Sequence, residues 1–379
     1  MTPQIGSFAL ATADYEAWLD ERISLVPQDV ADKHSQMASA LFPFLRATFY
    51  RWAQLWPLLQ EEGLESLDAP EVLAVGDLHM ENFGTWRDAE ARLVWGINDF
   101  DEACRMPYSI DLVRLAASVF LAIDSGQLGL GHQEAAEAIR TGYREGLVSG
   151  GSPFVLGESH GWLLDLVRPA RPANFWEKML SLKEFSGKVP KAAVKGLERL
   201  LPGKNLEYRL AHRVAGLGSR GRQRFVAIAD FEGGHVCREA KELTTSAWWW
   251  ARKRQTDAGI RYQDALDRAV RARDPFVRAR SGWVVRRLAP DCAKIALADV
   301  PKDKEKDKLL HAMGREAANV HLGSGSPRAI VRDLDSRGKQ WLHDAAGFMV
   351  HATRADWEEW KKSAARAQPP APVPLKPGR

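Results

Sequence analysis

Two kinds of hydrophobic spacing alternate along the chain. Apolar residues recur at three- and four-residue intervals over residues 35–59 and from Leu112 to Ile123, and this spacing predicts amphipathic helices. Pro43 forces a break or kink in the first, and Ser109 or Asp111 can cap the second. The same spacing predicts helices near residues 259–273 and from Leu309 to Val320.

Short apolar runs of strand type lie between these segments. Residues 72–75 and 92–97 each form such a run, and each is followed by a polar loop. Phe225–Ala229 and His235–Lys241 flank a Glu-Gly-Gly turn, which predicts a β-hairpin, and Trp283–Val285 is a further strand-like run. The pattern therefore predicts an α+β chain in which a small antiparallel β part lies between helical parts.

Length and composition indicate a folded protein with more than one lobe. The chain has 379 residues, of which 45% are hydrophobic and 27% charged, so two lobes with a cleft are expected. The longest apolar stretch, Leu115–Ile123, falls short of the roughly 18 residues that span a bilayer. The first twenty residues do not resemble a secretory signal, and the three cysteines lack C-x-x-C spacing. We therefore expect a cytoplasmic protein with reduced thiols.

Positive charge is concentrated in one segment. The net charge is +4, but residues 251–290 hold eleven Lys or Arg against four Asp. Such a patch attracts nucleic acid, an acidic partner or nucleotide phosphates, or is simply a solvated helix face. Nucleic acid is not favoured, because no base-reading motif is present. Three consecutive tryptophans, Trp248–Trp250, are expected to place one or two indoles at a partner site or aromatic platform.

The polar loop after residues 72–75 carries the first candidate chemistry. Asp77 and Asn82 form a D-x-x-x-x-N motif, the spacing of the catalytic loop in protein kinases and their small-molecule relatives. A phosphoryl-transfer site needs a carboxylate that accepts the proton of the attacking hydroxyl and an amide oxygen that holds magnesium. Asp77 and Asn82 are assigned to these two tasks.

The second strand-like run ends in further acids. Asp99 and Asp101 follow it, with Asp99 lying 22 residues after Asp77. Converging carboxylate and amide oxygens can bridge a magnesium ion to nucleotide phosphates, so Asp99 and Asp101 are assigned to the metal together with Asn82. The alternative is that the two aspartates cap a turn.

A glycine loop and a lysine lie far downstream. The G-x-G-x-x-G motif comprises Gly216, Gly218 and Gly221 and includes Ser219, and the returning hairpin strand carries Lys241. Glycines let backbone amides approach phosphates, and a lysine on a neighbouring strand neutralises them. The motif also occurs in dinucleotide-binding folds, but there a helix follows the glycines, whereas here a strand follows.

Lys241 needs an acidic partner. Between Lys241 and Trp283 the only glutamate is the adjacent Glu242, so Asp264, with Asp267 as the other choice, is expected to substitute for the helix glutamate of kinases. The alternative is that Asp264 pairs with arginines on its own helix.

Together these motifs resemble the signature run of aminoglycoside phosphotransferases and choline kinases. The resemblance covers about forty contiguous residues, from Gly76 through Asp99 to Tyr108-x-x-Asp111-Leu112. It implies that Asp77 is the catalytic base, that Asn82 and Asp99 hold magnesium, and that Asp111 braces the catalytic loop. Val75 departs from the histidine usual in those relatives, and Gln223 departs from the usual valine after the glycine loop.

The order of the motifs differs from those relatives, because the acids precede the glycine loop. The chain thus looks like a circularly permuted protein-kinase-like fold, and it resembles the bacterial family catalogued as domain of unknown function 2252. The expected divisions are a helical lobe with the catalytic loop (1–200), a β-rich nucleotide lobe (201–290), returning helices (291–365) and a proline-rich tail (366–379).

The resemblance implies an ATP- and Mg²⁺-dependent phosphotransferase acting on a hydroxyl. The acceptor and the oligomeric state stay open. Two alternatives remain: a nucleotide-binding pseudokinase that acts as a scaffold or sensor, and a nucleotidyl transferase on the same fold. A metallophosphoesterase also uses a GD-x-H start but needs a later G-N-H run, which the chain lacks.

Overall fold

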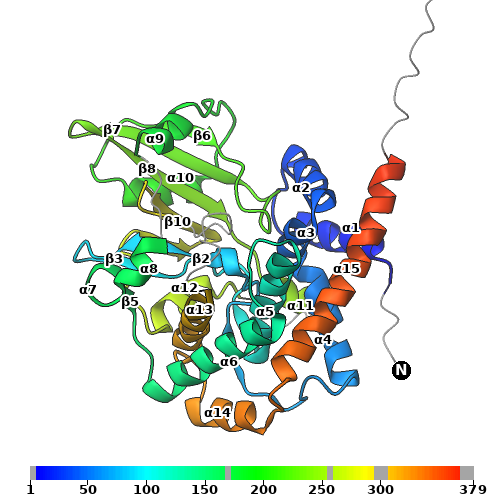
Figure 1. The fold of residues 1–379 in the computed structure, drawn as a ribbon. Coiled ribbons are helices and arrows are strands. Elements are labelled where there is room, and N and C mark those ends of the chain that lie inside the picture. Colours follow the sequence, from blue (N-terminus) through cyan, green and yellow to red (C-terminus); the bar gives the residue numbers. More distant parts are fainter. Residues whose placement is uncertain (1–5, 167–171, 254–258, 294–305, 368–379) are drawn as a thin grey trace, which may run out of the picture.

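A computed structural model describes residues 6–166, 172–253, 259–293 and 306–367, with side chains described up to residue 363. The chain is a mixed α+β protein with small antiparallel sheets (Figure 1). The helices of the N-terminal 150 residues are α1 (Phe8–Asp20), α2 (Pro27–Ser39), α3 (Leu41–Ala47), α4 (Phe49–Glu61), α5 (Ser109–Asp124) and α6 (His132–Ser149). The later helices are α7 (Leu156–Ser159), α8 (Gly161–Leu166), α9 (Pro172–Leu180), α10 (Lys191–Leu200), α11 (Ala247–Ala251), α12 (Tyr262–Arg268), α13 (Lys306–His321), α14 (Pro327–Ser336) and α15 (Trp341–Ala367).

The strands form three sheets. A two-stranded sheet pairs β1 (Glu71–Ala74) with β4 (Cys104–Pro107), and a three-stranded sheet has the order β2 (Phe83–Arg87), β3 (Leu93–Ile97), β5 (Phe154–Val155). The five-stranded sheet has the order β6-β7-β8-β10-β9, from β6 (Arg209–His212), β7 (Arg224–Phe231), β8 (Gly234–Glu242), β9 (Val277–Arg280) and β10 (Trp283–Leu288). All its pairings are antiparallel, and the register sets Lys241 opposite Arg224 on one side and Val284 on the other.

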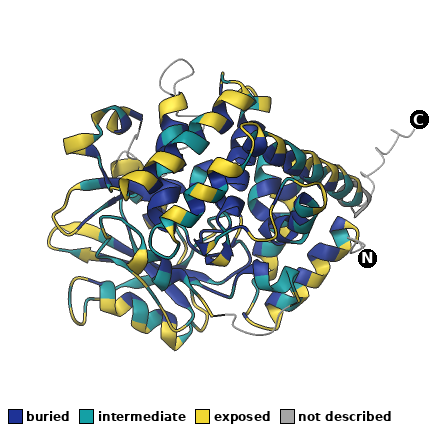
Figure 2. Cartoon of the chain, turned by 90° about the horizontal axis from the view of Figure 1, so that it is seen from below, coloured by how far each residue is buried: buried dark blue, intermediate teal, exposed yellow. Residues whose placement is uncertain are grey.

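The main hydrophobic core lies among the helices. Helix α5 is buried over almost its whole length, α13 packs along α6, and the long α15 packs along α5. Figure 2 shows buried segments at the centre of the helices and exposed ones around the rim. The two strand ends that carry the candidate acids are anchored in this core by Val75 and Leu78 after β1 and by Ile97 and Phe100 at the end of β3.

The five-stranded sheet has small cores of its own. On one face, Phe225 and Trp283 pack against α10, and on the other, Ile228 and Leu288 pack against Met179 of α9. The expected boundary at residue 200 assigns α9 and α10 to the helical lobe, but these two helices cover the sheet. Their amphipathic character fits either lobe, so the sequence pattern alone does not assign them.

Most of the predicted elements are confirmed. The helical run at 35–59 is broken into α2, α3 and α4, the hairpin of β7 and β8 is present with Glu232 and Gly233 at positive φ in its turn, and α5 and α13 form as expected. The helix expected over 259–273 is shorter, since α12 ends at Arg268.

The tryptophan run faces the N-terminal helices. Trp248 is buried, while Trp249 and Trp250 are partly buried against the main core, with Trp250 edge-on to Tyr15 and Tyr50. The indoles therefore join α11 to α1 and α4. The proline-rich end, residues 368–379, lies outside the described residues. Over the described part of the chain, no helix has the length and apolar character needed to cross a membrane.

Candidate functional site

The loop after β1 is held by a buried acid. Gly76 has φ +83°, and a Cβ there would lie 2.8 Å from the carbonyl oxygen of Glu102, so the turn requires glycine. The two carboxylate oxygens of Asp111, in the first turn of α5, accept the backbone N–H groups of Val75 and Gly76 at 2.7 Å each. His321, at the end of α13, contacts the same carboxylate through Nε2 at 2.8 Å. Asp111 thus braces the loop, and His321 supports Asp111.

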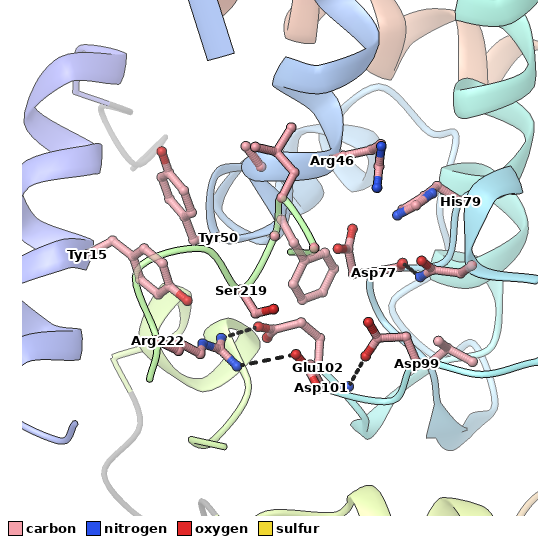
Figure 3. Close-up of a pocket in the computed structure, with 17 residues that line it drawn as sticks. Tyr15, Arg46, Tyr50, Asp77, His79, Asp99, Asp101, Glu102, Ser219 and Arg222 are labelled. Carbon is pink, nitrogen blue, oxygen red and sulfur yellow. Dashed lines mark hydrogen bonds and ion pairs between the residues drawn. The ribbon is translucent and has the colours of Figure 1, made fainter. Parts of the chain in front are cut away.

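Asp77 points into a cleft between this loop and the glycine loop (Figure 3). Its Oδ1 accepts hydrogen bonds from Arg114, whose fully buried guanidinium donates from Nε at 2.7 Å and also from Nη2. Burial raises the pKa of the Asp77 carboxyl to about 6, although Arg114 opposes that rise. A carboxyl with this pKa is largely ionised at neutral pH yet remains basic enough to accept a proton.

Asn82 closes the same loop. Its Nδ2 donates to the backbone carbonyl oxygen of Asp77, and its own backbone N–H bonds to the carbonyl of His79. Because the amide nitrogen is used inside the loop, the amide oxygen is the group that Asn82 has left for a ligand in the cleft it lines.

The acids after β3 meet the lysine of β8. Lys241 is 1% exposed, and its Nζ lies 3.2 Å from Oδ1 of Asp99 and 2.5 Å from Oδ1 of Asp101. Burial raises the pKa of Asp101, and the neighbouring Asp99 carboxylate raises it further, against the lysine and Arg222. Two stretches 142 residues apart in sequence therefore converge on one point.

The glycine loop is tied down across the cleft. Arg222, which follows the last glycine and is 4% exposed, donates to Glu102 at 3.0 Å and lies 3.7 Å from Asp101 (Figure 3). Ser219 accepts a hydrogen bond of 2.9 Å from Arg224. A Cβ at Gly218 would lie 3.2 Å from Oδ2 of Asp77, so the loop backbone rests against that carboxylate.

The N-terminal helices hold the loop from outside. The backbone N–H of Val26 donates to the carbonyl of Gly221 at 2.8 Å, Arg220 pairs with Asp32, and His212 contacts Asp29 at 2.9 Å. The cavity left in the cleft is about 40 Å³, which holds only a few water molecules. The cleft is therefore closed in this structure.

Nine of the ten residues predicted for the site belong to this region. Asp77, Asn82, Asp99, Asp101, Gly216, Gly218 and Ser219 line the cleft, Lys241 lies against its acids, and Gly221 ends the loop. Asp264 does not join them. It is 43% exposed on α12 and pairs with Arg261 at 3.2 Å, so the expectation that it partners Lys241 is wrong: Asp101 takes that place.

Sequence reasoning missed the cations and aromatic residues of the cleft. Arg114 and Arg222 neutralise its acids, Glu102 anchors the loop, and Tyr15 and Tyr50 form a wall. The sequence contained a signal for Arg114, because this arginine lies next to the apolar face of a helix that is otherwise buried. Arg222 and Glu102 have no such signal, since their pairing depends on the closure of the two halves.

The side-chain oxygens of the cleft provide part of the ligand set that a magnesium ion takes. Searched over the described residues, no three His, Cys, Asp or Glu side chains converge as a ready metal cage. Magnesium at nucleotide sites, however, takes only one or two carboxylates and completes its shell with phosphate oxygens and water. Asp99, 24% exposed, and the Asn82 amide oxygen provide such a set.

Comparison with known proteins adds one match. The chain matches no curated protein and no solved structure. Residues 24–150, which contain Asp77, Asn82 and Asp99 but end before the glycine loop, match the family described as "Uncharacterized protein conserved in bacteria" and named domain of unknown function 2252.

Proposed function

We propose that the protein is an ATP- and Mg²⁺-dependent phosphotransferase that acts on a hydroxyl group, on a circularly permuted protein-kinase-like fold. The observation that carries the proposal is the meeting of Lys241 with Asp99, in a cleft that also holds Asp77 and the glycine loop. Lys241 lies on the third strand in chain order of the five-stranded sheet, and the glycine loop joins the first two, as in protein kinases.

The roles follow from the positions of the side chains. Asp77, with one oxygen on Arg114, accepts the hydroxyl proton through the other as the acceptor oxygen bonds to the γ-phosphorus and the bond to ADP breaks. Asp99 and Asn82 hold the magnesium ion, which when bound neutralises charge on the phosphate oxygens. Asp101 keeps Lys241 in place, the part played in kinases by the helix glutamate.

A triphosphate enters this cleft only after the glycine loop moves. The loop backbone occupies the space beside Asp77, and Arg222 holds it to Glu102. When the loop opens, the ion pair between Arg222 and Glu102 breaks. Hydrogen bonds from Lys241 and the loop amides to phosphate oxygens offset the free energy lost with that pair. The closed cleft is thus a resting state.

Titration calorimetry with ATP, in the presence and absence of Mg²⁺, tests the nucleotide site. Wild type is expected to bind ATP in a metal-dependent way, Asp99→Asn to lose that dependence, and the exposed control Asp264→Asn to match wild type. Equal binding by wild type and Asp99→Asn with and without metal, or no binding by wild type, overturns the proposal.

A pseudokinase is the second candidate, and the closed cleft with its glycine loop against Asp77 favours it. Turnover separates the two: the phosphotransferase releases ADP, and Asp77→Ala keeps nucleotide affinity while it loses this reaction. Nucleotide binding without turnover in wild type supports the pseudokinase. Release of AMP or pyrophosphate in place of ADP identifies nucleotidyl transfer.

A further inference from the structure

A second cavity lies beside the cleft and is lined by different residues. It has a volume of about 180 Å³ and is bounded by β10, β2, α12 and the segment that connects α12 to β9. Asn98 lines it, and the next residue, Asp99, lines the cleft. The two cavities therefore lie on either side of the Asn98–Asp99 segment.

The second cavity is rich in arginine. Its lining includes two aspartates, Asp267 and Asp274, and the arginines Arg213, Arg271, Arg273, Arg278, Arg286 and Arg287. Six guanidinium groups against two carboxylates give the lining an excess of positive charge. Like charges at this density repel one another unless anions lie between them.

Acids of the protein compensate only some of this charge. Arg213 and Arg286 share the carboxylate of Glu239, which also binds Arg224, and Arg287 lies 3.9 Å from Asp291. Each of these arginines therefore has at most a share of one carboxylate or a distant one.

Within the described chain, Arg271 lacks an acceptor for part of its guanidinium. Its guanidinium lies over the rings of Trp86 at 4.4 Å and Phe100 at 5.4 Å, and its Nη1 is buried with no hydrogen-bond acceptor among the described residues. Burial lowers the pKa of Arg271 against the opposing charges of Glu316 and Asp274, and neither acid forms an ion pair with it in the described part of the chain. A buried N–H donor of a cation that has no acceptor is costly.

Arg278 also carries positive charge without an acidic partner among the described residues, on the solvent-exposed side of the cavity. It donates to the carbonyl of Val277 at 2.7 Å, and no acid of the described residues pairs with it. Arg273 has only a loose pair with Asp267, at 3.7 Å. Arg271 and Arg278 thus provide donors at the inner and outer parts of the same cavity.

From this arrangement we propose that the arginine cavity binds a phosphate-bearing small anion, with Arg271 and Arg278 as its ligands. The planar guanidinium offers paired N–H donors that match two phosphate oxygens, and the Trp86 ring packs against the guanidinium of Arg271. The small volume favours a compact diphosphate over a nucleic-acid strand. This site is separate from the proposed nucleotide cleft, and it does not require magnesium.

Calorimetry with pyrophosphate in the presence of EDTA tests the proposal. Wild type is expected to bind pyrophosphate more tightly than inorganic phosphate. Arg271→Gln and the exposed Arg278→Gln should each weaken binding by about tenfold or more, the effect of losing a hydrogen bond to a charged group. Arg271→Lys, which keeps the charge but not the fork, should weaken it less, and the exposed control Arg268→Gln should not change it.

The same titrations separate this site from the cleft. Asp99→Asn is expected to keep metal-free pyrophosphate binding. If wild type binds pyrophosphate but shows no metal-dependent ATP binding, the proposed function alone is rejected. Unchanged pyrophosphate affinity in both arginine variants, or no pyrophosphate binding by wild type, overturns the cavity proposal. The cavity proposal is also overturned if the arginine variants lose binding of a single-stranded oligonucleotide but keep binding of pyrophosphate.

Discussion

Glu239 is the side chain whose neutralisation should most disturb the five-stranded sheet. It lies on β8 and is fully buried, and three arginines bind its carboxylate: Arg213 through Nη1, Arg224 at 3.0 Å and Arg286 at 2.8 Å. These arginines come from the segment after β6, from β7 and from β10. One carboxylate therefore joins three parts of the sheet. The substitution Glu239→Gln preserves its shape and removes its charge.

The expected magnitude follows from burial. Breaking a buried ion pair by removing one partner costs about 3–5 kcal/mol, because the remaining charge is left without compensation. Burial alone would raise the pKa of Glu239, but the three arginines outweigh it and hold the pKa well below its usual value of 4.5. A lowered folded-state pKa stabilises the fold above the unfolded pKa, and this contribution is lost as the pH falls through the folded value.

Urea unfolding at pH 7, followed by circular dichroism and tryptophan fluorescence, measures the effect. Glu239→Gln is expected to lose about 3–5 kcal/mol of unfolding free energy, and the difference from wild type should shrink in acid.

Glu242 on the same strand is the matched control. Burial raises the pKa of Glu242 to about 7, so Glu242→Gln should leave stability unchanged or increase it at pH 8. A loss of less than about 1 kcal/mol in Glu239→Gln would refute this account of the arginine cluster.

The loop from Gly76 to Asn82 supports two further predictions. If Asp77 is the base, kcat/KM for phosphoryl transfer should fall below pH about 6, as the carboxyl protonates; a flat profile between pH 5 and pH 7 would contradict that role. Asp111→Asn leaves one carboxylate-bound backbone N–H of the loop without its acceptor, so it should lower unfolding free energy by about 1–3 kcal/mol and reduce kcat more than nucleotide affinity. Equal loss in both would indicate general misfolding.

Local sequence patterns predicted the parts of the site that lie within one motif. The spacing from Asp77 to Asn82 and the position of Asp99 at a strand end are short-range features, and the backbone brings these residues to the same cleft. The brace by Asp111 was implied only by the resemblance to aminoglycoside phosphotransferases and choline kinases, and the structure shows its carboxylate on the backbone of the loop. The histidine that contacts Asp111 was not predicted. Position 75 is valine and not histidine, and the imidazole on Asp111 comes from His321, 210 residues later.

Which individual side chains pair across the two halves of the chain could not be predicted in this way. Lys241 was expected to pair with an acid on the next helix, but α12 directs Asp264 to the surface, where Arg261 is an adequate partner. Asp101 is two residues beyond Asp99, and the loop after β3 turns both carboxylates toward the same ammonium. Which of several acids meets a distant lysine is decided by how the sheet docks, and residue spacing does not encode that docking.

The closed cleft also limits how the proposed reaction can begin. Asp99 and Asp101 together carry more negative charge than the single ammonium between them, and Arg222, which also pairs with Glu102, supplies part of the balance from the glycine loop. Removing the loop alone would leave buried carboxylates under-compensated, which is unfavourable. If the proposed function holds, a metal ion bound at Asp99 would supply positive charge, and its phosphate partner would supply an acceptor for the loop amides. The proposed function therefore predicts that loop opening is coupled to binding of the metal–phosphate pair, and that free phosphate without metal opens the cleft poorly.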